Sequence, residues 1–269
     1  MGGRGGSMGG SHGMGGGGGA GGAGGAAKAA APAAPQTREQ QLLAQIKGNP
    51  AALMQMSDQD ALDTMQEIAK MPLPNDGTRN NTFLQRYLEA TGLANDMPTV
   101  LDEKTFEAER QKIGARVLYH SDQPTDGTIA STRKTQQQLQ TGATAYASCG
   151  VHGSGTYLDT DAANNAICYG YGGTQVKLFI NRNAKLARSS DLLQAEANFR
   201  VKHPKTYAYL QGLDRKLGTH RKSEIKTIYL TAAGYNVFSR QNGYKVAYSR
   251  KALTICNTIR DASTVTANW

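Results

Sequence analysis

The residues best suited to chemistry fall into three short segments, with a helix after the second. Leu-Tyr-His ends one predicted strand at His120, and Gly-Ser-Gly-Thr-Tyr-Leu, residues 153–158, begins the next. A predicted helix over residues 162–169 ends on a tyrosine, and Gly-Tyr-Lys-Val-Ala-Tyr, residues 243–248, forms a late strand. A single histidine or tyrosine of this kind is often structural. Occurring in this order and on these elements, they together indicate one site.

Several standard catalytic and binding motifs are absent. The sequence has no phosphate-binding Gly-x-x-x-x-Gly-Lys-Ser/Thr loop, no His-Glu-x-x-His and no Gly-x-Ser-x-Gly. The glycines of residues 150–155 lead into a strand and not a helix, so the dinucleotide-binding fingerprint is not met. Cys149 and His152 have the spacing of two zinc ligands, but no second pair accompanies them. We therefore expect no metal site.

In their order and secondary-structure context, the three segments resemble the His-Tyr-Glu class of ADP-ribosyltransferases, which includes diphtheria-type toxins and poly(ADP-ribose) polymerases. In that class the first strand ends in Leu-x-His. The second motif is Gly-x-Gly-x-Tyr, followed by a helix that carries another tyrosine. The resemblance covers residues 115–256, about half of the chain. It implies an α+β fold with an ADP-ribosyltransferase-like split β-sheet, and NAD as a substrate.

The resemblance also implies roles for individual residues. His120 would hydrogen-bond the adenosine ribose, Tyr157 would stack on the nicotinamide, and Tyr169 would form the second stacking wall. The glycines would let the backbone approach the ligand closely. The expected NAD-binding residues are His120, Ser121, Gly153, Gly155, Tyr157 and Tyr169.

The catalytic glutamate of the class has no counterpart in the last segment. The family's glutamate precedes the tyrosine of the closing strand, where this chain has Gly243, and residues 225–260 contain no Asp or Glu. We expect Tyr157 and Glu224 to act as catalytic residues, with Glu224 entering the pocket through the fold. Two alternatives are that Glu196 enters instead, or that an acidic substrate supplies the carboxylate. Without any of these, the domain would be a non-catalytic module.

The rest of the chain divides by composition. Half of the 32 glycines lie within the first 27 residues, so residues 1–36 are expected to be a disordered Gly/Ala-rich tail. Residues 37–114 are a helical lead-in, with Ser57 and Asp102 as predicted helix caps. Residues 115–260 form the transferase-like domain and residues 261–269 a C-terminal tail. Within that domain, strands are predicted over 116–119, 155–158, 175–180, 244–248 and 253–256, and helices over 128–140, 161–169, 189–202, 204–213 and 223–233.

Charge and hydropathy limit the partners. The chain of 269 residues has a net charge of +9, which predicts weak attraction to nucleic acid. It has no apolar stretch of about 18 residues, so no membrane segment is expected. Its three cysteines are odd in number and lack Cys-x-x-Cys spacing, which favours a reducing compartment.

The layout as a whole also resembles proteins encoded near the head genes of tailed phages and prophages, such as minor head proteins. This resemblance implies a place in the host cytoplasm or the virion. We expect NAD-dependent mono-ADP-ribosyl transfer to a protein of the bacterial host. One alternative is an inactive structural or interaction module that binds phage capsid or portal proteins. Another is a basic nucleic-acid-binding protein.

Overall fold

The computed structural model describes residues 36–72, 83–122, 128–141, 149–150, 153–169, 173–217, 222–240 and 244–266. For Gly153, Tyr169 and Glu224 it describes the backbone alone. Apart from Gln36, the predicted N-terminal tail lies outside the described residues. The chain from Gln36 onward forms one compact unit, which includes both the helical lead-in and the predicted transferase-like domain.

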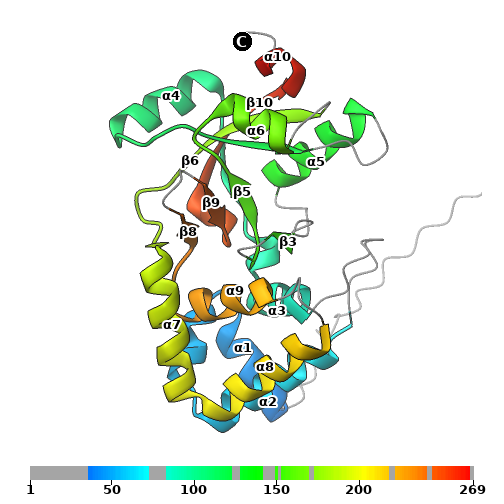
Figure 1. Ribbon diagram of the computed structural model, residues 1–269, viewed down its shortest axis with the longest axis vertical. Coiled ribbons are helices and arrows are strands. Elements are labelled where there is room, and N and C mark those ends of the chain that lie inside the picture. The colour runs from blue at the N-terminus through cyan, green and yellow to red at the C-terminus, as the bar shows by residue number, and fades with distance from the viewer. Residues whose placement is uncertain are drawn as a thin grey trace, which may run out of the picture. The chain divides into compact units, whose positions relative to one another are not determined.

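Helices account for most of the regular structure (Figure 1). The helices of the described residues are α1 (Arg38–Ile46), α2 (Asp58–Lys70), α3 (Phe83–Thr91), α4 (Glu103–Lys112), α5 (Ile129–Thr141), α6 (Ala162–Tyr169), α7 (Ser189–Lys202), α8 (Pro204–Leu217), α9 (Lys222–Ala232) and α10 (Ala262–Thr266), with short 3₁₀ turns η1 (Pro50–Gln55), η2 (Leu93–Asn95) and η3 (Arg250–Ala252).

Local side-chain caps explain where the lead-in helices begin. The Ser57 side chain accepts a hydrogen bond from the Asp60 backbone N–H, and the Asp102 side chain accepts one from the Thr105 N–H. Both caps satisfy N–H groups that have no partner within the helix. The two predicted caps are thus confirmed. Gly92, with φ of +75°, follows α3 in the left-handed conformation that glycine adopts without strain.

The strands are short and form two main sheets. They are β1 (Thr99–Leu101), β2 (Leu118–Asp122), β3 (Cys149–Gly150), β4 (Gly153–Ser154), β5 (Thr156–Leu158), β6 (Thr174–Ile180), β7 (Leu186–Ala187), β8 (Val237–Ser239), β9 (Lys245–Ala247) and β10 (Leu253–Asp261). Among the described residues, one sheet has the order β1-β10-β6-β2, another β5-β9-β8-β7, and β3 pairs with β4. Both larger sheets mix parallel and antiparallel pairs. The prediction of an α+β fold is confirmed.

Three hydrophobic clusters of the described residues hold these elements, and the smallest packs Phe106 of α4 on Phe179 and Cys256. The largest joins the lead-in helices α1, α2 and α3 to α7, α8, α9 and the β5-β9-β8 strands, so that Leu84 and Tyr157 belong to the same core. The second lies where side chains of the two sheets meet, among them Leu118, Leu158 and Leu178. The lead-in therefore contributes to the core beneath the strand that carries Tyr157.

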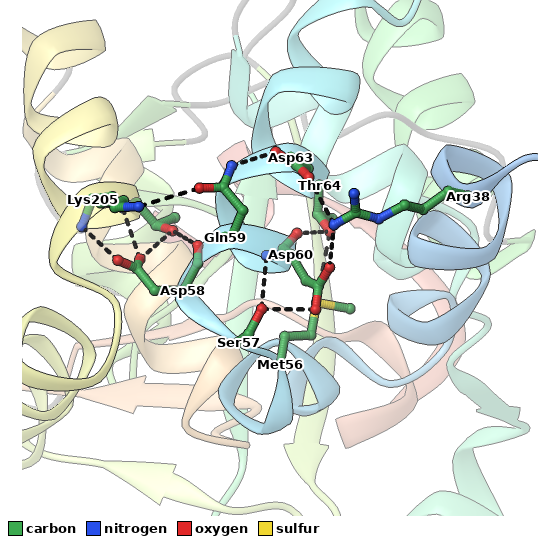
Figure 2. A network of polar contacts seen from close by, with 10 residues as sticks. Arg38, Met56, Ser57, Asp58, Gln59, Asp60, Asp63, Thr64 and Lys205 are labelled. Carbon is green, nitrogen blue, oxygen red and sulfur yellow. Dashed lines mark hydrogen bonds and ion pairs between the residues drawn. The ribbon is translucent and has the colours of Figure 1, made fainter.

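A polar network connects helix α2 to helix α8, which packs against it (Figure 2). The Asp58 carboxylate accepts hydrogen bonds from the backbone N–H groups of Lys205 and Thr206, at 3.0 and 3.1 Å. Burial disfavours the Asp58 charge, but these hydrogen bonds outweigh it and lower the pKa of Asp58. Asp58 thus caps the first turn of α8 from a different helix, 147 residues away in sequence.

Candidate functional site

The two sheets adjoin at the residues that the sequence singled out. The backbones of Tyr119 in β2 and Asp159 after β5 exchange two hydrogen bonds, of 2.8 and 3.0 Å. This bridge brings the end of β2 beside β5. The His120 ring nitrogen Nδ1 then lies 2.8 Å from the carbonyl oxygen of Tyr157. Because a carbonyl only accepts hydrogen bonds, Nδ1 carries the hydrogen and Nε2 remains for another partner.

A carboxylate stands near that second nitrogen. Asp122 Oδ2 lies 3.4 Å from His120 Nε2, an ion-pair distance, and the His120 side chain is only 14 % exposed. Burial disfavours a charged imidazole, but the Asp122 carboxylate and the Tyr157 carbonyl outweigh it, so the pKa of His120 is raised above its ordinary value. The site therefore holds a histidine that is biased toward its charged, two-donor form.

Ser121 lies on the opposite side of β2 from His120, as alternate residues of a strand do. Its hydroxyl donates to Asn165 Oδ1 of α6 at 2.6 Å and accepts from Gln175 Nε2 of β6 at 3.0 Å. All three side chains are buried. Ser121 thus ties α6, the helix that ends at Tyr169, to the strand that carries His120.

Tyr157 is 9 % exposed, and its ring packs on Tyr244, with centroids 5.2 Å apart and planes inclined by 46°. Tyr244 immediately precedes β9, whose Val246 pairs with Tyr157 in the sheet. The second and third sequence motifs therefore meet as an aromatic pair. A flat ligand ring could join such a pair by stacking.

The two glycines of the second motif have different surroundings. A Cβ on Gly155 would lie 2.5 Å from the Ala247 carbonyl oxygen and 2.7 Å from a Val246 methyl, so only glycine lets the backbone pass β9 here. Gly153 pairs with Gly150 in the β3–β4 hairpin. The close approach at Gly155 is to the protein's own strand.

The remaining predicted residues are placed only in part. Tyr169 is the last residue of α6, and Glu224 lies in the first turn of α9, a helix that contacts β3 and β4. Gly243 lies outside the described residues. Glu196 accepts a hydrogen bond from the Tyr207 hydroxyl, at 3.0 Å, where α7 meets α8. Glu196 is thus engaged in helix packing.

Sequence reasoning missed the carboxylate partner of His120. Asp122 follows His120 by two residues in a strand, and the two-residue period of strands puts both on one face, so the signal was available. Asn165 and Gln175 carried no such signal, because their contact with Ser121 arises from the packing of α6 on the sheet.

Metal and membrane features are absent from the part of the chain that is described. No group of three or more His, Cys, Asp or Glu side chains there is placed to hold a metal ion. Nor does any helix within it combine the length and apolar character that crossing a bilayer requires. A cavity of about 480 Å³ does occur, but neither His120 nor Tyr157 is among its lining residues.

Comparisons with protein-family models, with curated proteins and with solved structures found no match to this chain.

Proposed function

We propose that the chain is an ADP-ribosyltransferase of the His-Tyr-Glu type that uses NAD to modify a protein of a bacterial host. The contact of His120 with the Tyr157 carbonyl carries this proposal. The two residues are 37 positions apart and come from different sheets, yet they are in contact, and an NAD-binding site of that type would use both. A phage-encoded protein, delivered by the virion, is the setting that we infer for this activity.

The proposed reaction transfers the ADP-ribosyl group of NAD to the target protein. The bond between the ribose C1 and the nicotinamide nitrogen breaks, and nicotinamide leaves with the bonding electrons. A nucleophilic atom of the target protein bonds to C1 and loses its proton to solvent. Tyr157, Tyr244 and Tyr169 would hold the nicotinamide ring by stacking. His120, whose charged form Asp122 favours, would donate its Nε2–H to an adenosine ribose hydroxyl in place of Asp122.

Positive charge that develops on the ribose needs a carboxylate. We assign this role to Glu224, in the first turn of a helix that contacts the β3–β4 hairpin beside the second motif. The ADP-ribosyltransferase-like core is part of the same proposal. What supports it is the occurrence of the first two motifs on adjoining strands of separate sheets, with a helix after the second.

The test is release of nicotinamide from labelled NAD by the purified chain in bacterial lysate, with label transfer to protein. His120→Ala, Tyr157→Ala and Glu224→Gln should each lower the rate by about a hundredfold or more, as expected when a positioning or charge-stabilising group is lost. Tyr207→Ala is the control, because this tyrosine packs in the helical region and should leave the rate unchanged.

Because Tyr157 is buried, the melting temperature of Tyr157→Ala must be compared with that of the other variants. A folded wild-type chain that releases no nicotinamide and gains no thermal stability from millimolar NAD would overturn the proposal. Retained NAD stabilisation without transfer, in contrast, would identify a binding module. In that case the enzymatic part of the proposal would be wrong.

A further inference from the structure

A second site is suggested by the cavity of about 480 Å³, which lies where the lead-in meets the sheets. Its walls come from five connections: those after α1, after α3 and after α9, the one between β6 and β7, and the one from β9 to η3. Its volume is within the range of sites for small molecules. Since His120 and Tyr157 do not line it, it is separate from the proposed NAD site.

Among the charged residues that line the cavity, two lysines face one aspartate: Lys185, Lys251 and Asp96. Asp96 is 5 % exposed, and its charge is already met by Lys251 Nζ at 2.8 Å and by a hydrogen bond from the Ser249 hydroxyl. Lys185, on the β6–β7 connection, forms no ion pair with any described residue. Arg250, between Ser249 and Lys251, is buried outside the lining and donates to the Ala94 carbonyl, so Lys185 is the cation of the lining that no described carboxylate pairs. An anion is the ligand that this wall favours.

Lys185 is exposed, and its ammonium lies near the turn after α9. Gly234, with φ of +83°, forms the turn after α9, and the nearest atoms to a Cβ built there would be Lys185 Nζ and the Ala51 methyl, both at 3.9 Å. The carboxyl end of α9 attracts the lysine charge to this place without pairing it. Lys185 is among the residues that line the cavity, and its ammonium is therefore available to a phosphate or carboxylate.

Neutral hydrogen-bonding groups complete the lining. Asn49 and Asn183 are exposed, and neither side-chain amide bonds to another described residue. The half-buried Tyr235 adds an aromatic ring. An amide both donates and accepts, so a pair of them suits neighbouring hydroxyl groups.

From these features we propose that the cavity binds a small phosphorylated sugar. Lys185 would pair with the phosphate, and Asn49 and Asn183 would bond the sugar hydroxyls. Asp96 is the one carboxylate among the described lining residues, and Lys251 already pairs with it, so no free carboxylate is left to accept hydrogen bonds from sugar hydroxyls. Sugars without a phosphate should therefore bind weakly.

Calorimetric titration of the full chain with ribose 5-phosphate tests this, with ribose and inorganic phosphate as separate titrants. Ribose 5-phosphate should bind at least about tenfold more tightly than either, since only it reaches both kinds of group. Lys185→Gln should weaken its binding by about tenfold, the effect of one charge-assisted hydrogen bond.

Arg182→Gln is the matched control, because Arg182 is an exposed cation of the same β6–β7 connection that does not line the cavity. It should leave the affinity within about twofold. Equal losses in the two variants would indicate general attraction of anions and overturn the proposal, as would the absence of binding up to about 10 mM. His120→Ala should keep its affinity for ribose 5-phosphate. Loss of that affinity would indicate that the ligand binds at the proposed NAD site, and it would overturn the proposal of a second site.

Discussion

The sheet junction around His120 and the helix junction around His203 enclose the same side chain in two different ways. At the sheet junction, the Tyr157 carbonyl and the Asp122 carboxylate face the two ring nitrogens. The pKa of His120 is raised as a result, although burial acts in the opposite direction.

His203, between α7 and α8, has no exposed surface, and within the described residues its ring nitrogens have no hydrogen bond of good geometry, only a weak approach to the Leu53 backbone. Its ring centroid lies 5.2 Å from that of Phe199. Burial lowers the pKa of His203, and the Asp58 charge offsets this only in part. The comparison teaches that the partners of a buried histidine, more than its depth, decide whether it is charged.

Truncating Phe199 should have the largest effect on the helix junction. Phe199 is fully buried against His203 and Tyr229, so Phe199→Ala should cost about 3–5 kcal/mol in urea unfolding. The space created would also admit water and raise the pKa of His203, followed by NMR titration. Phe106→Ala is the matched control, because Phe106 is equally buried but packs on Phe179. It should cost a similar free energy while leaving His203 unchanged.

Removing the Asp58 charge should sharpen the contrast between the histidines. Asp58→Asn weakens the cap of α8 and should cost about 1–2 kcal/mol of unfolding free energy, measured in urea. It also removes the carboxylate that partly raises the pKa of His203, so this pKa should fall further. Asp63 lies on the same helix as Asp58 and pairs with Arg38 of α1, so Asp63→Asn is the matched control and should cost no more than about 0.5 kcal/mol. Equal costs for the two would contradict the capping role.

The pH dependence of stability should separate the two junctions. A histidine with a lowered folded pKa binds its proton more readily when unfolded, so His203 should destabilise the fold as pH falls below about 6.5. His203→Met should reduce this acid loss in urea titrations at pH 7.5 and 5.5. An unchanged acid loss would show that carboxylates alone account for it.

The smallest effect on stability is expected at the sheet junction. A raised folded pKa means that His120 contributes stability that is fully present below about pH 6.5 and is lost as pH rises through the folded pKa. Asp122→Asn should lower the pKa of His120, which NMR of its ring protons would show. The pH range over which His120 stabilises the fold should then end at a lower pH. An unaltered titration would mean that the Tyr157 carbonyl alone holds the charged form.

Much of the local structure could be predicted from the residues themselves. Ser57 and Asp102 cap their helices by hydrogen bonds to N–H groups three residues away. Such short-range contacts can be predicted from the local sequence alone. The strands β5, β6 and β9 were expected at nearly the observed positions, whereas β2 runs three residues beyond the expected end and β10 continues to Asp261. The two- and three-residue strands β1, β3, β4, β7 and β8 were missed because so short a segment shows little periodicity.

The sequence by itself determined the elements of this protein and the residue types that stand at their ends. Only the tertiary structure decided that His120 would meet the Tyr157 carbonyl, that Ser121 would turn to α6, and that Lys185 would face a cavity. The reason is physical. Caps and periodicity depend on neighbours within a turn, whereas these contacts depend on strand register and on how the helical core packs beneath the sheets.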